Sequence, residues 1–263
     1  MTFFIQVRSF VAISALCFTA LLPSTSHATI VEFETSLGNF EVNLYDNATP
    51  QTVANFLDYV QNGRYTDSIF HRSVANFVIQ GGGFNTDARA EIGVITAGAS
   101  VVNEPEYSNV RGTISMAKVA GNPNSATSQW FFNVVDNSNA LDGQNGGFTA
   151  FGEVIGNGMA VVDALAALPR YNIGSPLTEL PLRNYTSQDA ANNLPIDNTH
   201  LLIISSITVT DTTVDSAAGL NPTPNTANDG GGSLGGGGGG GGSTGLFLIF
   251  GLCAARLARL LHR

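Results

Sequence analysis

The segment from Phe70 to Phe84 places the strongest constraint on how this chain can fold. It reads FHRSVANFVIQGGGF, so that one guanidinium, on Arg72, and one amide, on Gln80, stand in two β-rich stretches of otherwise apolar side chains. Successive side chains of a strand point to opposite faces, so Arg72 is predicted to share a face with Phe70. By the same rule Val78 shares a face with Gln80. Two such strands converging would form a half-apolar groove with a few fixed hydrogen-bond donors, which suits an uncharged peptide segment.

Hydrophobic periodicity predicts a chain made mainly of strands. Alternating or continuous apolar runs predict strands over 30–35, 40–45, 69–72, 77–80, 113–117, 130–134, 150–154 and 201–209. A first helix is predicted to begin at Pro50, with Thr49 as its N-cap, and to stop at Gly63. A second helix is predicted over 158–167. Residues 170–200 contain few apolar side chains and indicate a long surface loop with one short helix.

The motif F-H-R-x4-F-x2-Q-G-G in the opening segment resembles the signature of cyclophilin-type peptidyl-prolyl isomerases. Three further blocks follow in family order, namely VRGTISMA at 110–117, SATSQWFFN at 125–133, and LDG at 141–143 with FGEV at 151–154. The resemblance covers residues 30–168. It implies a mainly β fold, a closed eight-stranded antiparallel barrel capped by two α-helices. Periodicity by itself indicates only a β-rich domain.

The amino-terminal residues 1–28 differ in composition from the rest of the chain. They contain a basic Arg8, an apolar stretch over 10–22 and the small-x-small sequence SHA before Thr29. This arrangement is typical of a secretory signal peptide cleaved before Thr29. The alternative interpretation is a buried core helix. The domain proper is then predicted to span 29–210.

The carboxyl-terminal residues form two segments. Residues 211–245 are polar and then almost entirely glycine and serine, which predicts a disordered linker. Residues 246–263 are apolar with a basic end, and are short against the roughly 20 residues that span a bilayer. Together they resemble the Gly-Gly type sorting tails of Gram-negative bacteria, which implies cleavage by a rhomboid-type protease and passage to the cell surface. The alternative is a plain membrane anchor. Both interpretations predict an exported protein, periplasmic or at the cell surface, whose terminal segment enters the membrane at least transiently.

Charge and cysteine content exclude several classes of function. Residues 29–229 contain all 20 acidic side chains and 7 of the 11 basic ones, a formal charge of 7 − 20 = −13. A surface this acidic repels phosphate backbones, which argues against nucleic-acid binding. The two cysteines, Cys17 and Cys253, lie in the end segments, so the domain has no disulfide, no nucleophilic thiol and no thiolate metal site. We expect the domain to need no metal or cofactor, and we also expect a monomer.

The family resemblance assigns the site residues. It implies that Arg72 is the catalytic donor to the prolyl nitrogen and that Gln80 orients it. The remaining side chains would bind a proline-containing polypeptide, with the backbone at Lys118 pairing with the residue before the proline: Phe77, Val78, Gln129, Phe131, Leu141 and Phe148. Phe148 stands where the family usually has His or Tyr, and Ala140 where it usually has Trp or Phe. The resemblance thus implies a peptidyl-prolyl cis-trans isomerase that acts without a covalent intermediate.

Each assignment has a plainer alternative. His71 could suggest a metal or acid–base role, but without partner ligands it is more typical of a hydrogen-bonded core residue. Phe77 and Phe131 could be ordinary core aromatics. The glycines at 81–83 lack the Lys-Ser/Thr of a phosphate-binding loop and indicate a close turn. At the level of function, the alternative is a proline-peptide binding or chaperone module with weak or no turnover, and surface scaffolding through the tail is compatible with either.

Overall fold

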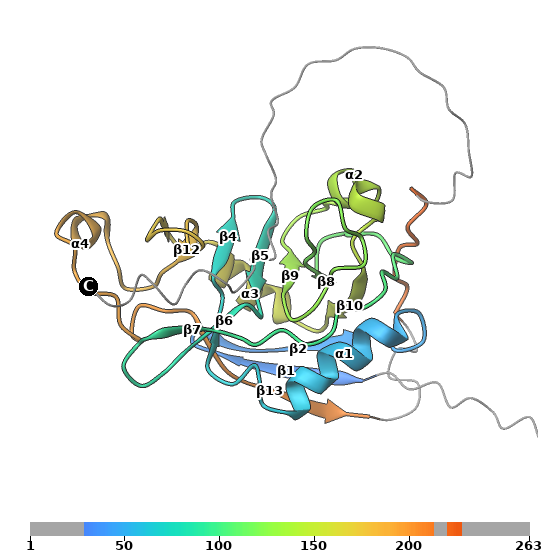
Figure 1. The fold of residues 1–263 in the computed structure, drawn as a ribbon, viewed down its shortest axis with the longest axis horizontal. Helices are drawn as coiled ribbons and strands as arrows, with labels where there is room; N and C mark the ends of the chain where they lie inside the picture. The colour runs from blue at the N-terminus through green and yellow to red at the C-terminus, as the bar shows by residue number, and fades with distance from the viewer. Residues whose placement is uncertain (1–28, 213–219, 228–263) are drawn as a thin grey trace, which may run out of the picture.

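The computed structural model of the chain describes residues 29–212 and 220–227. An antiparallel sheet of 11 strands curls into a half-barrel, with helix α1 along one side and a smaller lobe protruding beside β4 (Figure 1). The predicted signal peptide, the glycine run and the terminal segment 246–263 lie outside these residues. Within them, no helix is long and apolar enough to cross a bilayer.

The secondary structure is dominated by short strands, as the periodicity predicted. The strands of the large sheet are β1 (Ile30–Thr35), β2 (Gly38–Leu44), β3 (Ser68–Ile69), β4 (Arg72–Val74), β5 (Val78–Gly81), β6 (Phe84–Thr86), β7 (Ile92–Val94), β8 (Thr113–Met116), β9 (Trp130–Asn133), β10 (Ala150–Val154) and β13 (Ile203–Asp211). A separate pair is β11 (Arg170–Tyr171) with β12 (Leu180–Pro181). The helices are α1 (Pro50–Gln61), α2 (Ser138–Leu141), α3 (Gly158–Ala166) and α4 (Ser187–Ala191), with a 3-10 turn at Gln144–Gly146. The short helix α2 was not predicted, whereas α4 lies within 170–200, where one short helix was expected.

The strand order is β4-β5-β9-β8-β10-β2-β1-β13-β3-β6-β7. Strands β3 and β4 belong to one stretch of chain that is interrupted at Phe70 and His71. The Phe70 amide donates to the carbonyl of Leu202 beside β13, whereas the His71 amide donates to the carbonyl of Gln80 in β5. This single stretch therefore pairs with β13 through β3 and with β5 through β4.

Helix α1 begins where the sequence predicted but is capped differently. Thr49 occupies the N-cap position without capping, because its hydroxyl donates to the carbonyl of Tyr45. The first-turn amides of Gln51 and Thr52 instead donate to the carboxylate of Glu104, at 3.1 and 2.9 Å. A negative charge there satisfies free amides and opposes the positive end of the helix dipole. A loop 52 residues away in sequence thus fixes the start of the helix.

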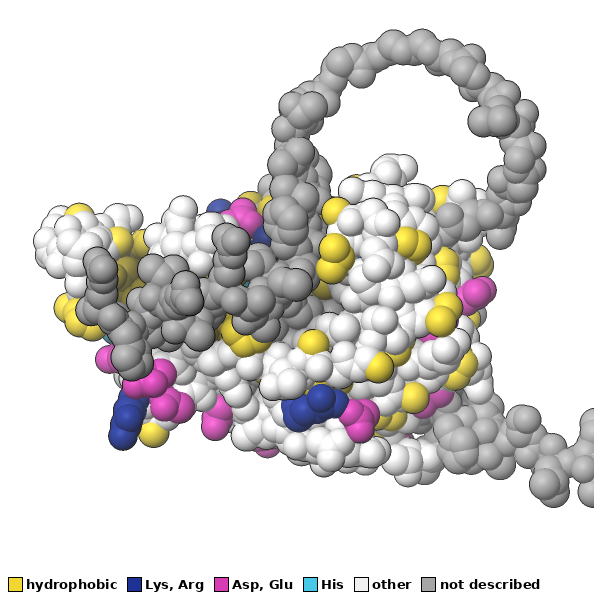
Figure 2. All heavy atoms as spheres, in the orientation of Figure 1, with side chains coloured by type: hydrophobic (Ala, Val, Ile, Leu, Met, Phe, Trp, Pro, Cys, Tyr) yellow, Lys and Arg dark blue, Asp and Glu magenta, His cyan; other side chains and the backbone are white. Residues whose placement is uncertain are grey.

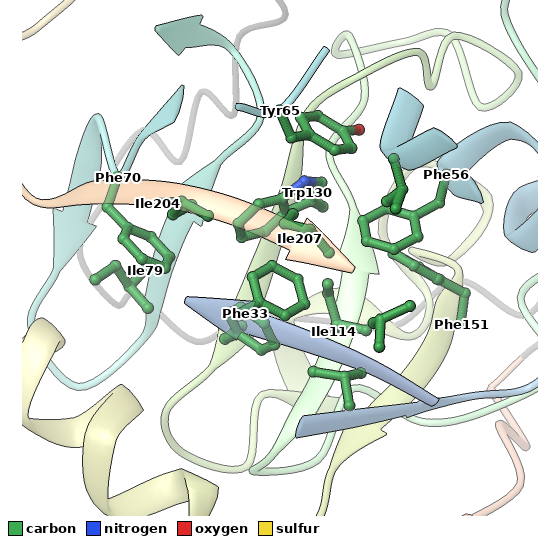
Figure 3. Packing of buried hydrophobic residues seen from close by; sticks show 14 of the residues in the cluster. Phe33, Phe56, Tyr65, Phe70, Ile79, Ile114, Trp130, Phe151, Ile204 and Ile207 are labelled. Atoms are coloured by element: carbon green, nitrogen blue, oxygen red, sulfur yellow. The ribbon is translucent and has the colours of Figure 1, made fainter. Parts of the chain in front are cut away.

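The main core is aromatic and centres on Trp130 (Figure 3). The indole is fully buried and packs edge-on against Phe33, Phe70 and Phe132, with ring centroids 5.4, 5.8 and 5.4 Å apart. Burying each such ring contributes about 2–3 kcal/mol, with about 1 kcal/mol more from edge-to-face geometry. This core therefore accounts for much of the stability of the half-barrel.

Residues 170–200 are more structured than the predicted surface loop. They contain the one short helix expected, α4, but their few apolar side chains also form a second small core against β3 and β6. Its buried members are Ile69, Phe84, Leu177, Leu180, Leu182, Tyr185 and Leu201. The interpretation failed here because a handful of large side chains, widely spaced in sequence, is enough to bury a lobe against an existing sheet.

Residues 220–227 fall inside the predicted disordered linker but are hydrogen-bonded to the domain. The Ser108 amide donates to the carbonyl of Thr223, and the Asn225 amide donates to the carbonyl of Glu106. The buried Asn225 side chain also donates to the carbonyl of Asp142 at 3.1 Å. These backbone groups have no signature in composition, which explains why the linker prediction did not separate this segment.

The glycine run after β5 allows the backbone to approach the indole of Trp130. A Cβ on Gly81 would lie 2.6 Å from the Trp130 ring, and one on Gly82 would lie 2.4 Å from the carbonyl oxygen of Ser128. Gly82 also has a φ of +75°, which side-chain-bearing residues rarely adopt. The expected close turn is therefore present, and close packing as well as the turn requires glycine.

Replacing Gly82 by alanine should destabilise the protein more than the same change at Gly121. Gly121 has a φ of +76°, but a Cβ there would meet no atom within 4 Å, so Gly121→Ala should cost only the backbone term, about 1 kcal/mol. Gly82→Ala adds steric overlap and should cost about 2–4 kcal/mol in all. Urea unfolding of both variants measures the difference, and equal losses would contradict the packing argument.

Candidate active site

Strand register brings the two predicted catalytic residues together. Arg72 pairs with Gln80 across β4 and β5, and Gln80 pairs with Phe131 across β5 and β9. Directly paired residues of neighbouring strands project from the same face of a sheet. Their chain neighbours Ile79 and Phe132 point the other way and belong to the main core. Arg72, Gln80 and Phe131 therefore lie in one row on the outer face.

Phe70 is the exception to the alternation argument. It was predicted to share a face with Arg72, but it packs in the main core against Trp130. The prediction is wrong because strand pairing is interrupted between β3 and β4, where the two-residue alternation no longer applies.

An apolar cluster lies on the outer face beside this row. Its buried members lie on β5, β9 and α2, just before β5 and β10, and just after β8. They comprise all five predicted apolar site residues with Ala117: Phe77, Val78, Ala117, Phe131, Leu141 and Phe148. The rings of Phe131 and Phe148 meet edge to face, with centroids 5.9 Å apart. Ala140, the residue before Leu141, is exposed on α2. The structure thus gathers these side chains into one buried apolar cluster, separate from the barrel core.

A chain of polar contacts orders the row. Arg72 Nη1 donates to Gln80 Oε1 at 3.5 Å, and Gln80 Nε2 donates to Gln129 Oε1 at 2.8 Å. The Arg72 Nε also pairs with the carboxylate of Glu179 at 2.9 Å, a contact absent from the sequence prediction. The Arg72 side chain is only 19% exposed. A permanently charged donor, fixed in direction and partly shielded from water, therefore stands at the edge of the apolar cluster.

Lys118 lies beneath the site, and its side chain has a role that sequence reasoning missed. The side chain is fully buried, and its ammonium donates to the Oδ1 of Asn103 at 3.1 Å and to the carbonyls of Asn145 and Gly147. It also lies 4.8 Å from the centre of the Phe148 ring. Burial lowers the pKa of Lys118 to about 8. The side chain thus holds the loop that positions Phe148, while the predicted pairing of its backbone with substrate stays a prediction.

His71 is a buried residue beneath the polar row. Its ring packs edge-on against Phe84, at 5.0 Å between centroids, and lies next to Gln129 and Gly83. Burial and, to a lesser degree, the charge of Arg72 lower the pKa of His71 to about 3. The imidazole is therefore neutral at physiological pH, which favours the core interpretation over an acid–base role.

Buried amides support the apolar cluster from behind. Asn137 Nδ2 donates to the carbonyl of Phe77 at 2.9 Å and to Asn133 Oδ1 at 2.7 Å. Asn109 Nδ2 donates to the carboxylate of Asp142 at 2.9 Å and to the carbonyl of Phe148 at 3.0 Å. Such buried bonds are costly to break because the freed groups lose both partner and water. Asparagines scattered in sequence gave no signal for this role, although Asn133 and Asp142 do fall within the motif blocks.

Metal binding is not indicated by the part of the chain that the structure describes. Among these residues, no group of three or more His, Cys, Asp or Glu side chains could hold an ion. In Figure 2, hydrophobic side chains are spread over the face shown, and acidic ones lie along its lower edge and also at its upper and right-hand margins.

Comparison of the chain with known proteins finds one matching family. Residues 30–187 match the family described as cyclophilin type peptidyl-prolyl cis-trans isomerase/CLD. A peptidyl-prolyl cis-trans isomerase of Acinetobacter baylyi is 45% identical over 150 residues, 56% of this chain and 76% of the relative. Peptidyl-prolyl cis-trans isomerase A of Dickeya dadantii is 38% identical over 183 residues, which cover 68% of this chain and 93% of the relative. A cyclophilin-type isomerase of Cryptosporidium parvum, solved also in the presence of the dipeptide Ala-Pro, aligns with a TM-score of 0.50 and 25% identity, over 70% of this chain and 99% of that one.

The neutral state of His71 should make folding stability sensitive to mild acid. The unfolded chain protonates this imidazole below about pH 6.5, whereas the folded protein resists protonation down to about pH 3. Stability should therefore fall as the pH drops through this window, by up to about 1.4 kcal/mol per pH unit from this one group. Urea unfolding at about pH 6.5 and about pH 5 should show a smaller loss in His71→Gln than in the parent. Equal losses would mean that His71 titrates normally.

Proposed function

The chain belongs to the cyclophilin-type peptidyl-prolyl cis-trans isomerase family, and we propose that Arg72 is the residue through which it accelerates rotation about X–Pro bonds. The observation that carries this proposal is the position of the Arg72 guanidinium, which is directed by Gln80 and Glu179 and lies beside the apolar cluster.

The reaction requires a site that fits a twisted imide better than a planar one. Resonance gives the bond partial double character and a barrier of about 18–20 kcal/mol. On twisting, the prolyl nitrogen becomes pyramidal and regains a lone pair that can accept a hydrogen bond. A guanidinium donor held at that point stabilises the twisted state selectively, and no covalent bond has to form. Arginine suits this task because its charge is permanent and its donors lie in one rigid plane.

The other residues would hold the substrate while one side of the bond turns. The apolar cluster offers Phe77, Phe131 and Leu141 as walls for the proline ring, and the Gln80 and Gln129 amides offer backbone hydrogen bonds. The Ala-Pro complex of the Cryptosporidium relative supports proline-containing peptides as the ligand class. We expect the domain to act on such polypeptides as a monomer, without metal or cofactor.

The runner-up function is proline-peptide binding with weak or no turnover. Two departures from the family pattern favour it, namely the exposed Ala140 on α2 and Phe148 in place of a polar-tipped ring. Neither removes a group that would contact the twisted imide nitrogen. The half-buried Arg72 next to Gln80 favours the enzyme.

We further infer that the half-barrel closes into the eight-stranded barrel that the resemblance implies. Support comes from residues 68–74, which bond β13 through Phe70 and β5 through His71. If β3 and β4 count as one bent strand, the ring runs through β5, β9, β8, β10, β2, β1 and β13 and returns to that strand.

We also propose that the protein acts on exported or surface proteins. Support comes from the sequence of 1–28, which resembles a signal peptide, and from the glycine run and basic apolar end of 230–263. The acidic, cysteine-free domain is compatible with that environment.

Arg72→Ala should lower isomerase activity by about 10²- to 10³-fold, because it deletes a donor used only in the transition state. Arg64→Ala is the matched control, since it removes another partly buried arginine that pairs with Asp58. A protease-coupled assay on a proline tetrapeptide measures both variants, and circular dichroism checks their fold. A folded Arg72→Ala variant whose isomerase activity is within about threefold of that of the parent would refute the role of Arg72. If the parent binds the peptide without turning it over, the proline-peptide binding function is favoured.

The tail should determine location without affecting catalysis. Deleting 230–263 should leave isomerase activity unchanged and release the protein from its normal compartment. Mass spectrometry of the mature protein distinguishes the two tail hypotheses. A carboxyl terminus within or just after the glycine run supports sorting and cleavage, and an intact Arg263 in a membrane fraction supports an anchor. An intact Arg263 in a soluble protein contradicts both.

A further inference from the structure

We propose that Glu179 is a positioning residue for Arg72, and that the lobe formed by residues 170–200 supplies it to the active site. The inference rests on the catalytic role proposed for Arg72. It assigns a function to a segment whose sequence suggested only a long surface loop with one short helix.

The contact between the lobe and the site is specific. The Glu179 carboxylate pairs with Arg72 Nε at 2.9 Å. The backbone is fixed at the same point, because the Ser73 amide donates to the Glu179 carbonyl at 2.9 Å. Strand β12 follows Glu179 directly and lies beside β4 (Figure 1). The carboxylate therefore reaches Arg72 from a backbone that is attached to the strand bearing Arg72.

The lobe is built to hold this position. Leu177 and Leu180, on either side of Glu179 in sequence, are buried against Ile69 and Phe84 in the second core. Two further hydrogen bonds tie the lobe together, one from the Tyr171 hydroxyl to the carbonyl of Tyr185 and one from Arg183 Nε to the carbonyl of Leu201. Glu179 thus stands on a packed support.

The pair orients Arg72 and contributes little to stability. The two side chains are 19% and 39% exposed, and ion pairs of such exposure contribute little to folding stability because water screens them. Their geometric effect is larger, because the guanidinium is planar and is held at two points, Nε by Glu179 and Nη1 by Gln80. In the described part of the chain no bond engages Nη2. The pair therefore fixes the plane while leaving a donor for substrate.

Fixing that plane should affect turnover more than binding. A free arginine side chain populates many rotamers, and only those aiming a donor at the imide nitrogen assist the reaction. Substrate binding depends mainly on the apolar cluster, to which Glu179 does not belong. Loss of Glu179 should accordingly appear in kcat and leave KM nearly unchanged.

The test compares Glu179→Ala and Glu179→Gln in the full chain, with Asp163→Ala as the matched control. The carboxylate of Asp163 also pairs with an arginine, Arg111. Asp163 lies on α3, and this pair is outside the polar row that contains Arg72. Glu179→Ala should lower kcat about tenfold with KM within about twofold. Glu179→Gln keeps an oxygen that can accept from Arg72 Nε and should retain at least about half of the activity. Asp163→Ala should match the parent.

Two readouts separate this proposal from a structural effect and from the role of Arg72 itself. In an Arg72→Ala background, Glu179→Ala should cause no further loss, because it acts only through Arg72. The Arg72 Nε–H resonance, assigned by its loss in Arg72→Ala, should be visible in the parent and in Glu179→Gln and should disappear in Glu179→Ala. If Arg72→Ala is inactive but Glu179→Ala is as active as the parent, only the positioning role is overturned. If Arg72→Ala is active, the catalytic role proposed for Arg72 is overturned as well. Equal losses in Glu179→Gln and Glu179→Ala, or additive losses with Arg72→Ala, would also overturn the positioning role.

Discussion

The antiparallel pairing of β5 with β9 is the constraint on which the rest of the structure depends. Each strand sends alternate side chains to opposite faces, so the same pairing buries Ile79 and Phe132 inside and presents Gln80 and Phe131 outside. A shift of one residue would exchange the two sets and destroy the core and the site together. The site therefore inherits its geometry from the register that the core enforces.

The core enforces that register through close contact as well as burial. Gly81 pairs with Trp130, and the indole occupies the space where a side chain on Gly81 would lie. Close packing of this kind tolerates few alternatives, because protein interiors are nearly as dense as organic crystals. On the outer face, by contrast, the walls come from α2 and the loop before β10, and buried bonds from Asn109 and Asn137 hold them. A stable interior thus fixes the row of Arg72, Gln80 and Phe131, while a polar framework holds the apolar cluster beside it.

The lobe at 170–200 shows how a peripheral segment can reach Arg72, the residue proposed to be catalytic. It buries a second core against β3 and β6, and its backbone bonds β4 next to Arg72. The strand bearing Arg72 is an edge strand of the sheet, which leaves its amides open to such an addition. The lobe bonds to that edge and also brings the Glu179 carboxylate to the Arg72 guanidinium.

The sequence by itself determined the family, the mainly β architecture and the two long helices, and it predicted the apolar side chains that the structure gathers into one cluster. Those features rest on local periodicity and on side chains that stand close together in motif blocks, such as Arg72 and Gln80. Tertiary structure alone decided what depends on contacts between distant segments. It moved Phe70 from the predicted site face into the core, replaced Thr49 by Glu104 as the cap of α1, and brought Glu179 to Arg72. The physical reason is that an interruption of strand pairing, or a charged side chain contributed by a remote loop, changes the surroundings of a residue. The local sequence pattern, which is all that sequence analysis reads, stays the same.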